Sequence, residues 1–222
     1  MTKACMFDLD GTILYTLDSI ARAGNRMLRE LGFPAQPLED YRDYCGDGAD
    51  QLVARALVKA KGYIPENVEA GQVLYRMFLA EDPLFKVVPY SGMKDALDAL
   101  KASGIKIFVF SNKPDDSAKK AVIGAYGPLY FDEIRGQRNG FPAKPSPEGA
   151  LEMLNKYQIK AEECFYIGDM GIDIKTGKNA GMPAVGVLWG YRDREELETY
   201  GADYIIGKPE ELLPLVVPGI SV

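Results

Sequence analysis

The feature that most constrains the fold is a short apolar run near the N-terminus that ends in two acids and a glycine. Residues 3–7 are mostly apolar without alternation, which is typical of a strand covered on both faces in a parallel sheet. The run leads into Asp8-Leu9-Asp10-Gly11-Thr12. Side chains two apart in a strand point the same way, and open parallel sheets bind ligands beyond the carboxyl ends of their strands. Asp8 and Asp10 are therefore expected to face one site, although an acidic turn that only ends a strand is the alternative.

The next part of the chain carries only helical periodicity. Thr16 is a fair N-cap for a first helix, and apolar residues recur at helical spacing through 17–31, 50–61 and 65–81. From residue 83 onward the character changes, because short apolar runs alternate with helical segments. We expect these runs to be strands at 105–110, 130–134, 164–167, 184–188 and 202–206. Such alternation predicts right-handed β-α-β units and a parallel sheet.

The sequence thus predicts an α/β fold in which a helical segment interrupts the sheet domain. The core is a Rossmann-like parallel sheet, and a small all-helical cap is inserted after the first strand. We expect residues 1–15 and 82–222 to form the core and residues 16–81 to form the cap.

The composition narrows the possible functions. The 222 residues include no histidine, which excludes a histidine base, metal ligand or nucleophile partner. The net charge of -6 makes nucleic acid an unexpected partner. No signal pattern or membrane-length apolar run is visible, so we expect a cytoplasmic protein with no membrane partner. Cys5, Cys45 and Cys164 have no metal-binding spacing and are expected to be buried, inert thiols.

Polar side chains follow three of the predicted strands: Asp8 and Asp10, then Ser111-Asn112-Lys113, then Asp169 with Asp173. Four carboxylates placed close together repel one another. Such a cluster needs a hard cation, and oxygen ligands favour Mg²⁺. Lys144, in a proline-rich loop, is a compact cation suited to phosphate. A carboxylate nucleophile, Mg²⁺, a hydroxyl donor and a lysine are what phosphoryl transfer through an aspartyl-phosphate requires.

Each of these groups also has a simpler interpretation. Asp169 and Asp173 could complement a helix dipole, Lys144 could be a solvated loop charge, and Ser111-Asn112 could be an N-cap pair. The Gly46-Asp47-Gly48 segment is as compatible with a plain turn as with a substrate-binding loop. For Arg42, a surface position is the alternative to contact with a substrate carboxylate.

Taken together, the motifs resemble those of the haloacid dehalogenase superfamily. Its four motifs occur in order as Asp8-Leu9-Asp10-Gly11-Thr12, Ser111-Asn112, Lys144, and Gly168-Asp169 with Asp173. The resemblance spans nearly the whole chain, and the helical insertion matches the small cap of that family. The segments 45–52, 173–182 and 186–191 are similar to those of its phosphoglycolate phosphatase subgroup.

The resemblance implies a role for each motif. Asp8 would be the nucleophile and Asp10 the general acid and base, with Ser111 and Lys144 assisting catalysis. The transferring phosphoryl group would be bound by Thr12, Ser111, Asn112 and Lys144. Mg²⁺ would be held by Asp8, the Asp10 carbonyl and Asp169, with Asp173 in support. The cap residues expected to set substrate specificity are Arg42, Gly46 and Gly48.

The leading hypothesis is a Mg²⁺-dependent phosphatase acting on a small phosphorylated metabolite, 2-phosphoglycolate first. The alternatives are another small substrate (a sugar phosphate, a nucleotide or pyrophosphate), a sugar-phosphate mutase, or a non-catalytic regulatory protein. The mutases of the family use a cap-hinge histidine, which this chain lacks. Two departures from the family pattern are Tyr15, where an acid is usual, and Met170, where a hydroxyl is common. A monomer or a homodimer is expected.

Overall fold

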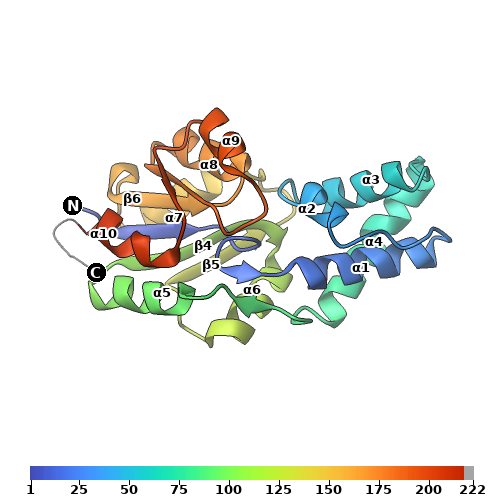
Figure 1. Ribbon diagram of the computed structural model, residues 1–222, viewed down its shortest axis with the longest axis horizontal. Helices are drawn as coiled ribbons and strands as arrows, with labels where there is room; N and C mark the ends of the chain where they lie inside the picture. Colours follow the sequence, from blue (N-terminus) through green and yellow to red (C-terminus); the bar gives the residue numbers. More distant parts are fainter. Residues whose placement is uncertain (218–222) are drawn as a thin grey trace.

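Figure 1 shows the computed structural model of the chain, in which residues 1–217 are described. At its centre is one sheet of six strands: β1 (Ala4–Phe7), β4 (Lys106–Pro114), β5 (Glu133–Gln137), β6 (Cys164–Gly168), β7 (Ala184–Val187) and β8 (Tyr204–Ile206). Their order is β5-β4-β1-β6-β7-β8, and every neighbouring pair is parallel. The predicted Rossmann-like parallel core is confirmed.

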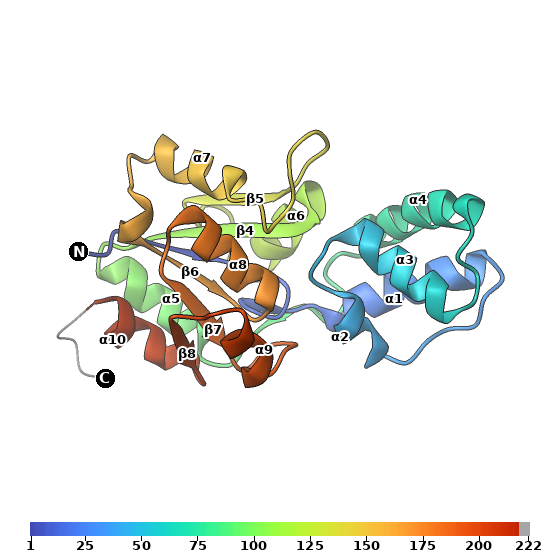
Figure 2. The ribbon, with the colours of Figure 1, turned by 90° about the horizontal axis from the view of Figure 1, so that it is seen from above.

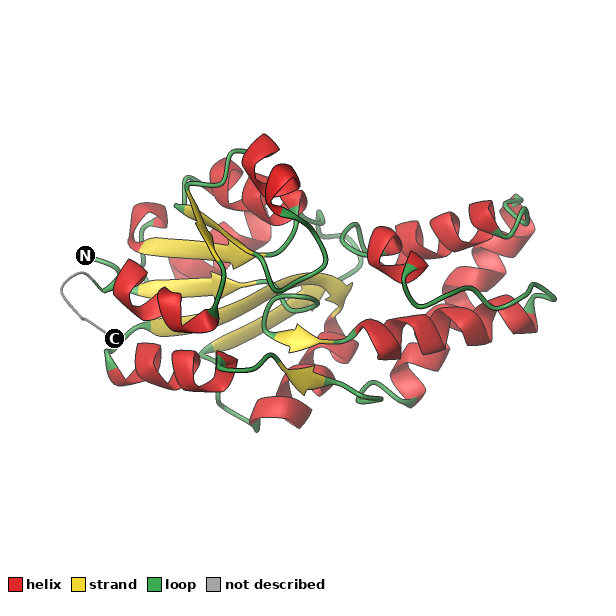
Figure 3. Ribbon diagram, viewed as in Figure 1, coloured by secondary structure: helices red, strands yellow, loops and turns green. Residues whose placement is uncertain are grey.

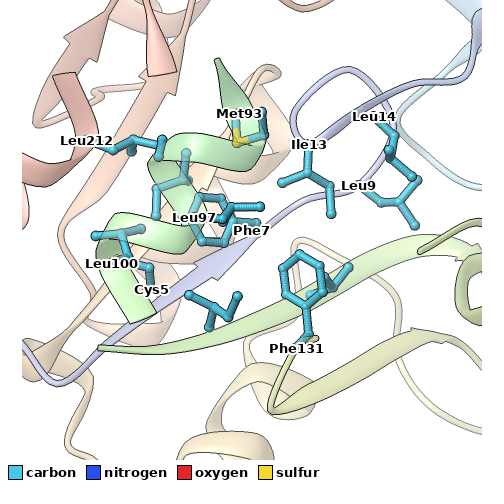
Figure 4. Close-up of a cluster of buried hydrophobic side chains, with 14 of the residues drawn as sticks. Cys5, Phe7, Leu9, Ile13, Leu14, Met93, Leu97, Leu100, Phe131 and Leu212 are labelled. Atoms are coloured by element: carbon cyan, nitrogen blue, oxygen red, sulfur yellow. The ribbon is translucent and has the colours of Figure 1, made fainter. Parts of the chain in front are cut away.

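Strand β1 occupies the middle of the sheet and is fully buried. Its side chains alternate between two apolar layers, with Cys5 and Phe7 on one face and Ala4 and Met6 on the other. Helices α5 (Met93–Ala102), α6 (Asp115–Tyr126) and α10 (Leu212–Val216) cover the first face, part of which Figure 4 shows. Helices α7 (Glu148–Lys156) and α8 (Gly171–Ala180) cover the second. Both faces are apolar because both are covered.

Four helices follow β1 and lie beyond the carboxyl ends of the sheet strands (Figures 1 and 2): α1 (Leu17–Glu30), α2 (Asp40–Tyr44), α3 (Ala49–Lys59) and α4 (Pro65–Glu81). We call residues 17–81 the helical block. It contains no strand (Figure 3) and has its own apolar core, which Met170 and Tyr191 of the sheet domain join. A short antiparallel pair, β2 (Leu14–Tyr15) with β3 (Val88–Pro89), flanks the block. The domain division at residues 16–81 stays a prediction.

The structure differs from the sequence expectations in a few elements. Strand β4 does not stop before Ser111 but continues through it to Pro114, and β5 begins at Glu133 rather than at Tyr130. Helix α2 and the β2–β3 pair were not expected, since each is too short to show a period. The Thr16 side chain makes no cap bond to α1, because its hydroxyl donates to Asp10 Oδ1 at 2.6 Å.

Two composition-based expectations can be compared with the structure. Cys5, Cys45 and Cys164 are all buried free thiols, and burial raises the pKa of each above its usual value. Within residues 1–217, no helix has both the length and the apolar character that crossing a membrane requires.

Candidate active site

Three carboxylates meet at the carboxyl edge of the two central strands. Asp8 directly follows β1, Asp169 follows the neighbouring β6, and Asp173 lies in the first turn of α8. One carboxylate oxygen from each lies within 4.8 Å of the others, and all three residues are buried. The chain must pass close to these acids, because a Cβ on Gly11 would meet Asp169 Oδ2 at 2.4 Å and one on Gly168 would meet Asp173 Cβ at 2.3 Å.

A single buried lysine joins two of these acids. Lys144 Nζ donates to Asp8 Oδ1 at 2.6 Å and to Asp173 Oδ1 at 2.7 Å. The loop that carries Lys144 is held by Asn112, whose Oδ1 accepts from the Lys144 N–H at 2.8 Å and whose Nδ2 donates to the Lys144 carbonyl at 3.2 Å. Lys144 is only 4% exposed, so it is not a solvated loop charge.

The donor set fits a divalent cation. If Asp8, Asp169 and Asp173 are all ionised, the single ammonium of Lys144 leaves two negative charges unbalanced. Burying unbalanced charge is energetically costly unless a cation is present. Asp169 has no cationic partner among residues 1–217. Its oxygens accept instead from the Thr12 hydroxyl and from the Tyr191 N–H, each at 2.8 Å. Closely spaced oxygen ligands carrying excess negative charge are the environment that Mg²⁺ prefers.

Burial and crowding shift the pKa values within this cluster. Burial raises the pKa of Asp8 to about 7, with Lys144 opposing and Asp173 and Asp10 reinforcing the rise. Burial, then the charges of Asp173 and Asp8, hold the pKa of Asp169 well above its usual range. Burial acts to lower the pKa of Lys144, but Asp173 and Asp8 raise it well above its ordinary value. Lys144 therefore stays charged, and the acids favour a bound proton or cation.

The Asp10 carboxylate lies apart from the group of three, so the expected cluster of four side chains is a cluster of three. Its Oδ1 accepts from the Thr16 hydroxyl at 2.6 Å and from Lys113 Nζ at 2.9 Å. Its Oδ2 has no partner among residues 1–217. The sequence placed Lys113 with Ser111 and Asn112 at this edge of the sheet but assigned it no role, because nothing local shows that it pairs with Asp10.

A cavity of about 40 Å³ lies between the acids and the helical block. The sheet domain lines it with Asp8, Asp10, Ser111, Asn112, Lys113, Pro114, Lys144, Met170, Ile172 and Asp173, and the block with Ile20, Cys45, Gly46, Gly48, Ala49, Leu52, Tyr75 and Leu79. Ser111 Oγ accepts from the Lys113 N–H at 3.3 Å, which leaves its own proton free to donate. Nucleophile, acid and lysine candidates thus share one small space.

The cap loop at residues 46–48 borders this cavity, as expected. Asn112 Nδ2 donates to the Gly46 carbonyl at 3.0 Å, so one amide joins the cap loop to the Lys144 loop. Gly46 and Gly48 have φ of 113° and 89°, conformations that side chains rarely adopt. A Cβ on Gly46 would also meet Met170 Sδ at 2.9 Å. Glycine is therefore required here by backbone shape.

Two other expected residues do not line the cavity. Arg42 is exposed, and its guanidinium donates to the carbonyls of Gly190 and Tyr191 at 3.3 and 3.2 Å. This places it on a loop of the sheet domain instead of facing a substrate carboxylate. The Thr12 hydroxyl donates to Asp169, so its side chain supports an acid instead of facing the cavity where a phosphate would bind.

The two departures from the family pattern lie beside the site. Tyr15 does not line the cavity, and its hydroxyl donates to Asp18 Oδ2 at 2.8 Å. Met170 lines the cavity with its side chain, while its N–H donates to Asp173 Oδ2 at 3.1 Å. Neither substitution therefore disturbs the three-carboxylate cluster.

Comparisons with known proteins agree with this geometry. Residues 5–187 match the family model of the haloacid dehalogenase-like hydrolases. The chain is 32% identical to phosphoglycolate phosphatases of Vibrio parahaemolyticus and Aquifex aeolicus, with 96% of each chain covered in both cases. A crystal structure of a candidate phosphoglycolate phosphatase from Lactobacillus delbrueckii subsp. bulgaricus superposes with a TM-score of 0.91 at 28% identity, covering 98% of this chain and 100% of that one. The chain therefore belongs to the haloacid dehalogenase-like hydrolase family, in its phosphoglycolate phosphatase-like group of phosphoric monoester hydrolases.

Proposed function

We propose that this protein is a Mg²⁺-dependent phosphatase that hydrolyses 2-phosphoglycolate through an aspartyl-phosphate on Asp8. The observation that carries the proposal is the convergence of Asp8, Lys144 and the unpartnered oxygen of Asp10 on one small cavity. The substrate is taken from the activity for which the 32% identical relatives are named.

The metal would be held by Asp8, the Asp10 carbonyl and Asp169, with Asp173 orienting Lys144 beside it. When bound, Mg²⁺ supplies positive charge to the phosphoryl oxygens. Lys144 supplies a second positive charge from a buried position, where electrostatic stabilisation is strong. The Ser111 hydroxyl is free to donate to a phosphoryl oxygen.

Two displacements complete the reaction. In the first, the Asp8 carboxylate forms a bond to phosphorus while the bond from phosphorus to the ester oxygen breaks, and Asp10 gives its proton to the departing glycolate oxygen. In the second, water forms a bond to phosphorus as Asp10 takes one of its protons. The Asp8–phosphorus bond then breaks, which releases phosphate and restores both carboxyl groups. Lys113 and Thr16 fix Asp10 through one oxygen, which leaves the other for this proton transfer.

The cavity size supports a small leaving group. A water molecule needs roughly 10–15 Å³ of such volume, so about 40 Å³ corresponds to roughly three waters. Because the phosphoryl group enters the same cavity, even 2-phosphoglycolate requires the helical block to open, and a nucleotide would require a much larger opening. The cytoplasmic location and the choice between a monomer and a homodimer stay predictions.

Phosphate release from a panel of esters tests the proposal. The panel contains 2-phosphoglycolate, a sugar phosphate, a nucleotide and pyrophosphate, each assayed with Mg²⁺ and with excess chelator. We expect Mg²⁺-dependent release, fastest from 2-phosphoglycolate. A faster rate with another ester would identify that ester as the substrate instead of 2-phosphoglycolate. Conversion of a sugar phosphate to its isomer would indicate a mutase. Full activity in chelator would overturn the metal assignment, and no release from any ester would favour a regulatory protein.

A further inference from the structure

One hydroxyl in the cavity wall has no hydrogen-bond partner in the described part of the chain. Tyr75, on α4, lines the cavity and is only 3% exposed, yet its Oη has no hydrogen bond among residues 1–217. Two other buried tyrosines of the helical block do have partners: Tyr41 Oη donates to Asn25 Oδ1 at 3.1 Å and Tyr44 Oη to Gln36 Oε1 at 2.9 Å. The Tyr75 oxygen is not enclosed like the buried, unpaired Ser19 Oγ and Asp40 Oδ2, so it reaches accessible space. Because Tyr75 lines the cavity, its hydroxyl has a hydrogen-bonding capacity there that residues 1–217 leave unused.

The wall around Tyr75 offers little else that is polar. The helical block contributes aliphatic side chains and glycines to the cavity, and its only other polar side-chain group is the Cys45 thiol, a weak donor. Across the cavity, the sheet domain presents Asp10 and Lys113. The cavity wall that the helical block provides is therefore mostly apolar and carries one phenol, which faces the Asp10–Lys113 ion pair of the sheet domain.

We propose that Tyr75 is a specificity-determining residue whose hydroxyl donates a hydrogen bond to the carboxylate of a small phosphorylated hydroxy acid. The inference rests on the proposed function and names the cap residue that selects its substrate. Burial, aided by the negative charge of Asp10, raises the pKa of Tyr75 well above its usual value, so the phenol is a proton donor. The charge of Lys113 on the same cavity is already paired with Asp10, so the Tyr75 hydroxyl is the donor of this wall that remains free for a substrate carboxylate.

The test compares two esters that differ only in the carboxylate: 2-phosphoglycolate and methyl phosphate. We expect Tyr75→Phe to lower the ratio of their kcat/KM values at least tenfold, mainly through a higher KM for 2-phosphoglycolate, because a site built around a hydrogen bond discriminates strongly. The matched control is Tyr44→Phe, which removes a phenol hydroxyl from the same block but away from the cavity. Its ratio should stay within twofold of the wild-type value.

Thermal unfolding separates recognition from packing. Because the Tyr75 hydroxyl bonds to nothing among the described residues, Tyr75→Phe should keep the wild-type Tm. A lowered ratio at an unchanged Tm supports the inference. An unchanged ratio, or equal losses on both esters with a lower Tm, overturns it and leaves the phosphatase chemistry standing.

A binding measurement keeps this inference distinct from the proposed function. If the wild-type protein hydrolyses no ester, the proposed function fails. Calorimetric titration of 2-phosphoglycolate into Asp8→Asn, with and without Tyr75→Phe, then decides the role of Tyr75. A tenfold weaker affinity in the double variant supports that role, and equal affinities overturn it.

Discussion

Lys113 Nζ lies 2.9 Å from Asp10 Oδ1, and the lysine side chain is 3% exposed. The Thr16 hydroxyl approaches the same oxygen at 2.6 Å. Lys113 comes from β4, whereas Thr16 directly precedes α1, so the sheet domain and the entry to the helical block fix the carboxylate together. Two partners on one oxygen orient Asp10 with its other oxygen free. Lys113 is therefore a positioning residue for the proposed general acid.

Replacing Lys113 with methionine should lower kcat for 2-phosphoglycolate by about tenfold or more, because general acid catalysis contributes roughly 10²–10⁴-fold and depends on orientation. The loss should be smaller for p-nitrophenyl phosphate, whose leaving group needs no proton. Steady-state kinetics with both esters measure the difference. Lys106→Met removes an exposed lysine from the same strand and is the control. Equal losses on the two esters would contradict a role through Asp10.

Asp8→Asn should abolish turnover, with kcat reduced by more than about a thousandfold, because an amide cannot form the acyl phosphate. The side chain is nearly isosteric, so circular dichroism should match that of the wild-type protein. Asp98→Asn changes an exposed aspartate paired with Lys94 and should keep full activity. Retention of more than a few per cent of activity in well-folded Asp8→Asn would exclude Asp8 as the nucleophile.

The parts of the site that sequence could predict are those that strand order brings together. Asp8 and Asp169 follow adjacent parallel strands, and Asp173 lies one helical turn after Asp169, so local motifs suffice to place all three. Lys144 lies in a loop, but few residues other than a lysine could balance these acids. The parallel sheet was predictable for a similar reason. The spacing of apolar residues within one segment shows which of its side chains are buried, and this distinguishes strands from helices.

The parts that sequence could not predict depend on how the helical block lies against the sheet domain. The Thr16 hydroxyl leaves its expected cap position because Asp10 offers a charged acceptor. Tyr75 appears in the sequence only as another residue of an amphipathic helix, and nothing local marks it as facing a cavity. Arg42 was expected at the substrate, yet packing brings it to the carbonyls of Gly190 and Tyr191. These contacts join segments separated by up to 149 positions.

The stability of the metal-free protein should fall as pH rises from about 4 through 7. Burial raises the pKa of Asp8 to about 7, above the value near 3.9 of an unfolded chain. The folded state therefore binds the Asp8 proton more tightly, and this contribution is complete below pH 4 and is lost as pH rises through 7. Mg²⁺ competes with protons for the same oxygens, so the rise in Tm that it causes should grow with pH.

Thermal unfolding with Mg²⁺ and with chelator between pH 5 and pH 8 measures both effects. Asp8→Asn is the internal control, because it lacks the titrating carboxylate and should show a flatter pH dependence without metal. A metal-free wild-type protein whose Tm follows that of Asp8→Asn across this range would show that Asp8 does not titrate there. If Mg²⁺ raised the Tm by the same amount at every pH, the metal would not be competing with protons for these acids and would have to bind elsewhere.

Arg42→Ala should leave substrate selectivity unchanged. The guanidinium bonds only to the carbonyls of Gly190 and Tyr191 among residues 1–217 and does not line the cavity. Tyr191 also donates its N–H to Asp169, so the substitution loosens a loop that orients an acid. We expect kcat/KM to fall by roughly two- to fivefold for both 2-phosphoglycolate and methyl phosphate, because two hydrogen bonds at the surface contribute about 1 kcal/mol.

The ratio of kcat/KM for 2-phosphoglycolate to kcat/KM for methyl phosphate shows whether Arg42 contacts the substrate carboxylate. Arg76→Ala removes an exposed arginine of α4 that pairs with Asp50 and should change neither value. If Arg42→Ala lowered kcat/KM for 2-phosphoglycolate several-fold more than for methyl phosphate, the arginine would have to reach the substrate carboxylate during turnover. The carbonyls of residues 190 and 191 would then release the Arg42 guanidinium when substrate binds. Arg42 and Tyr75 would together select a substrate that carries a carboxylate.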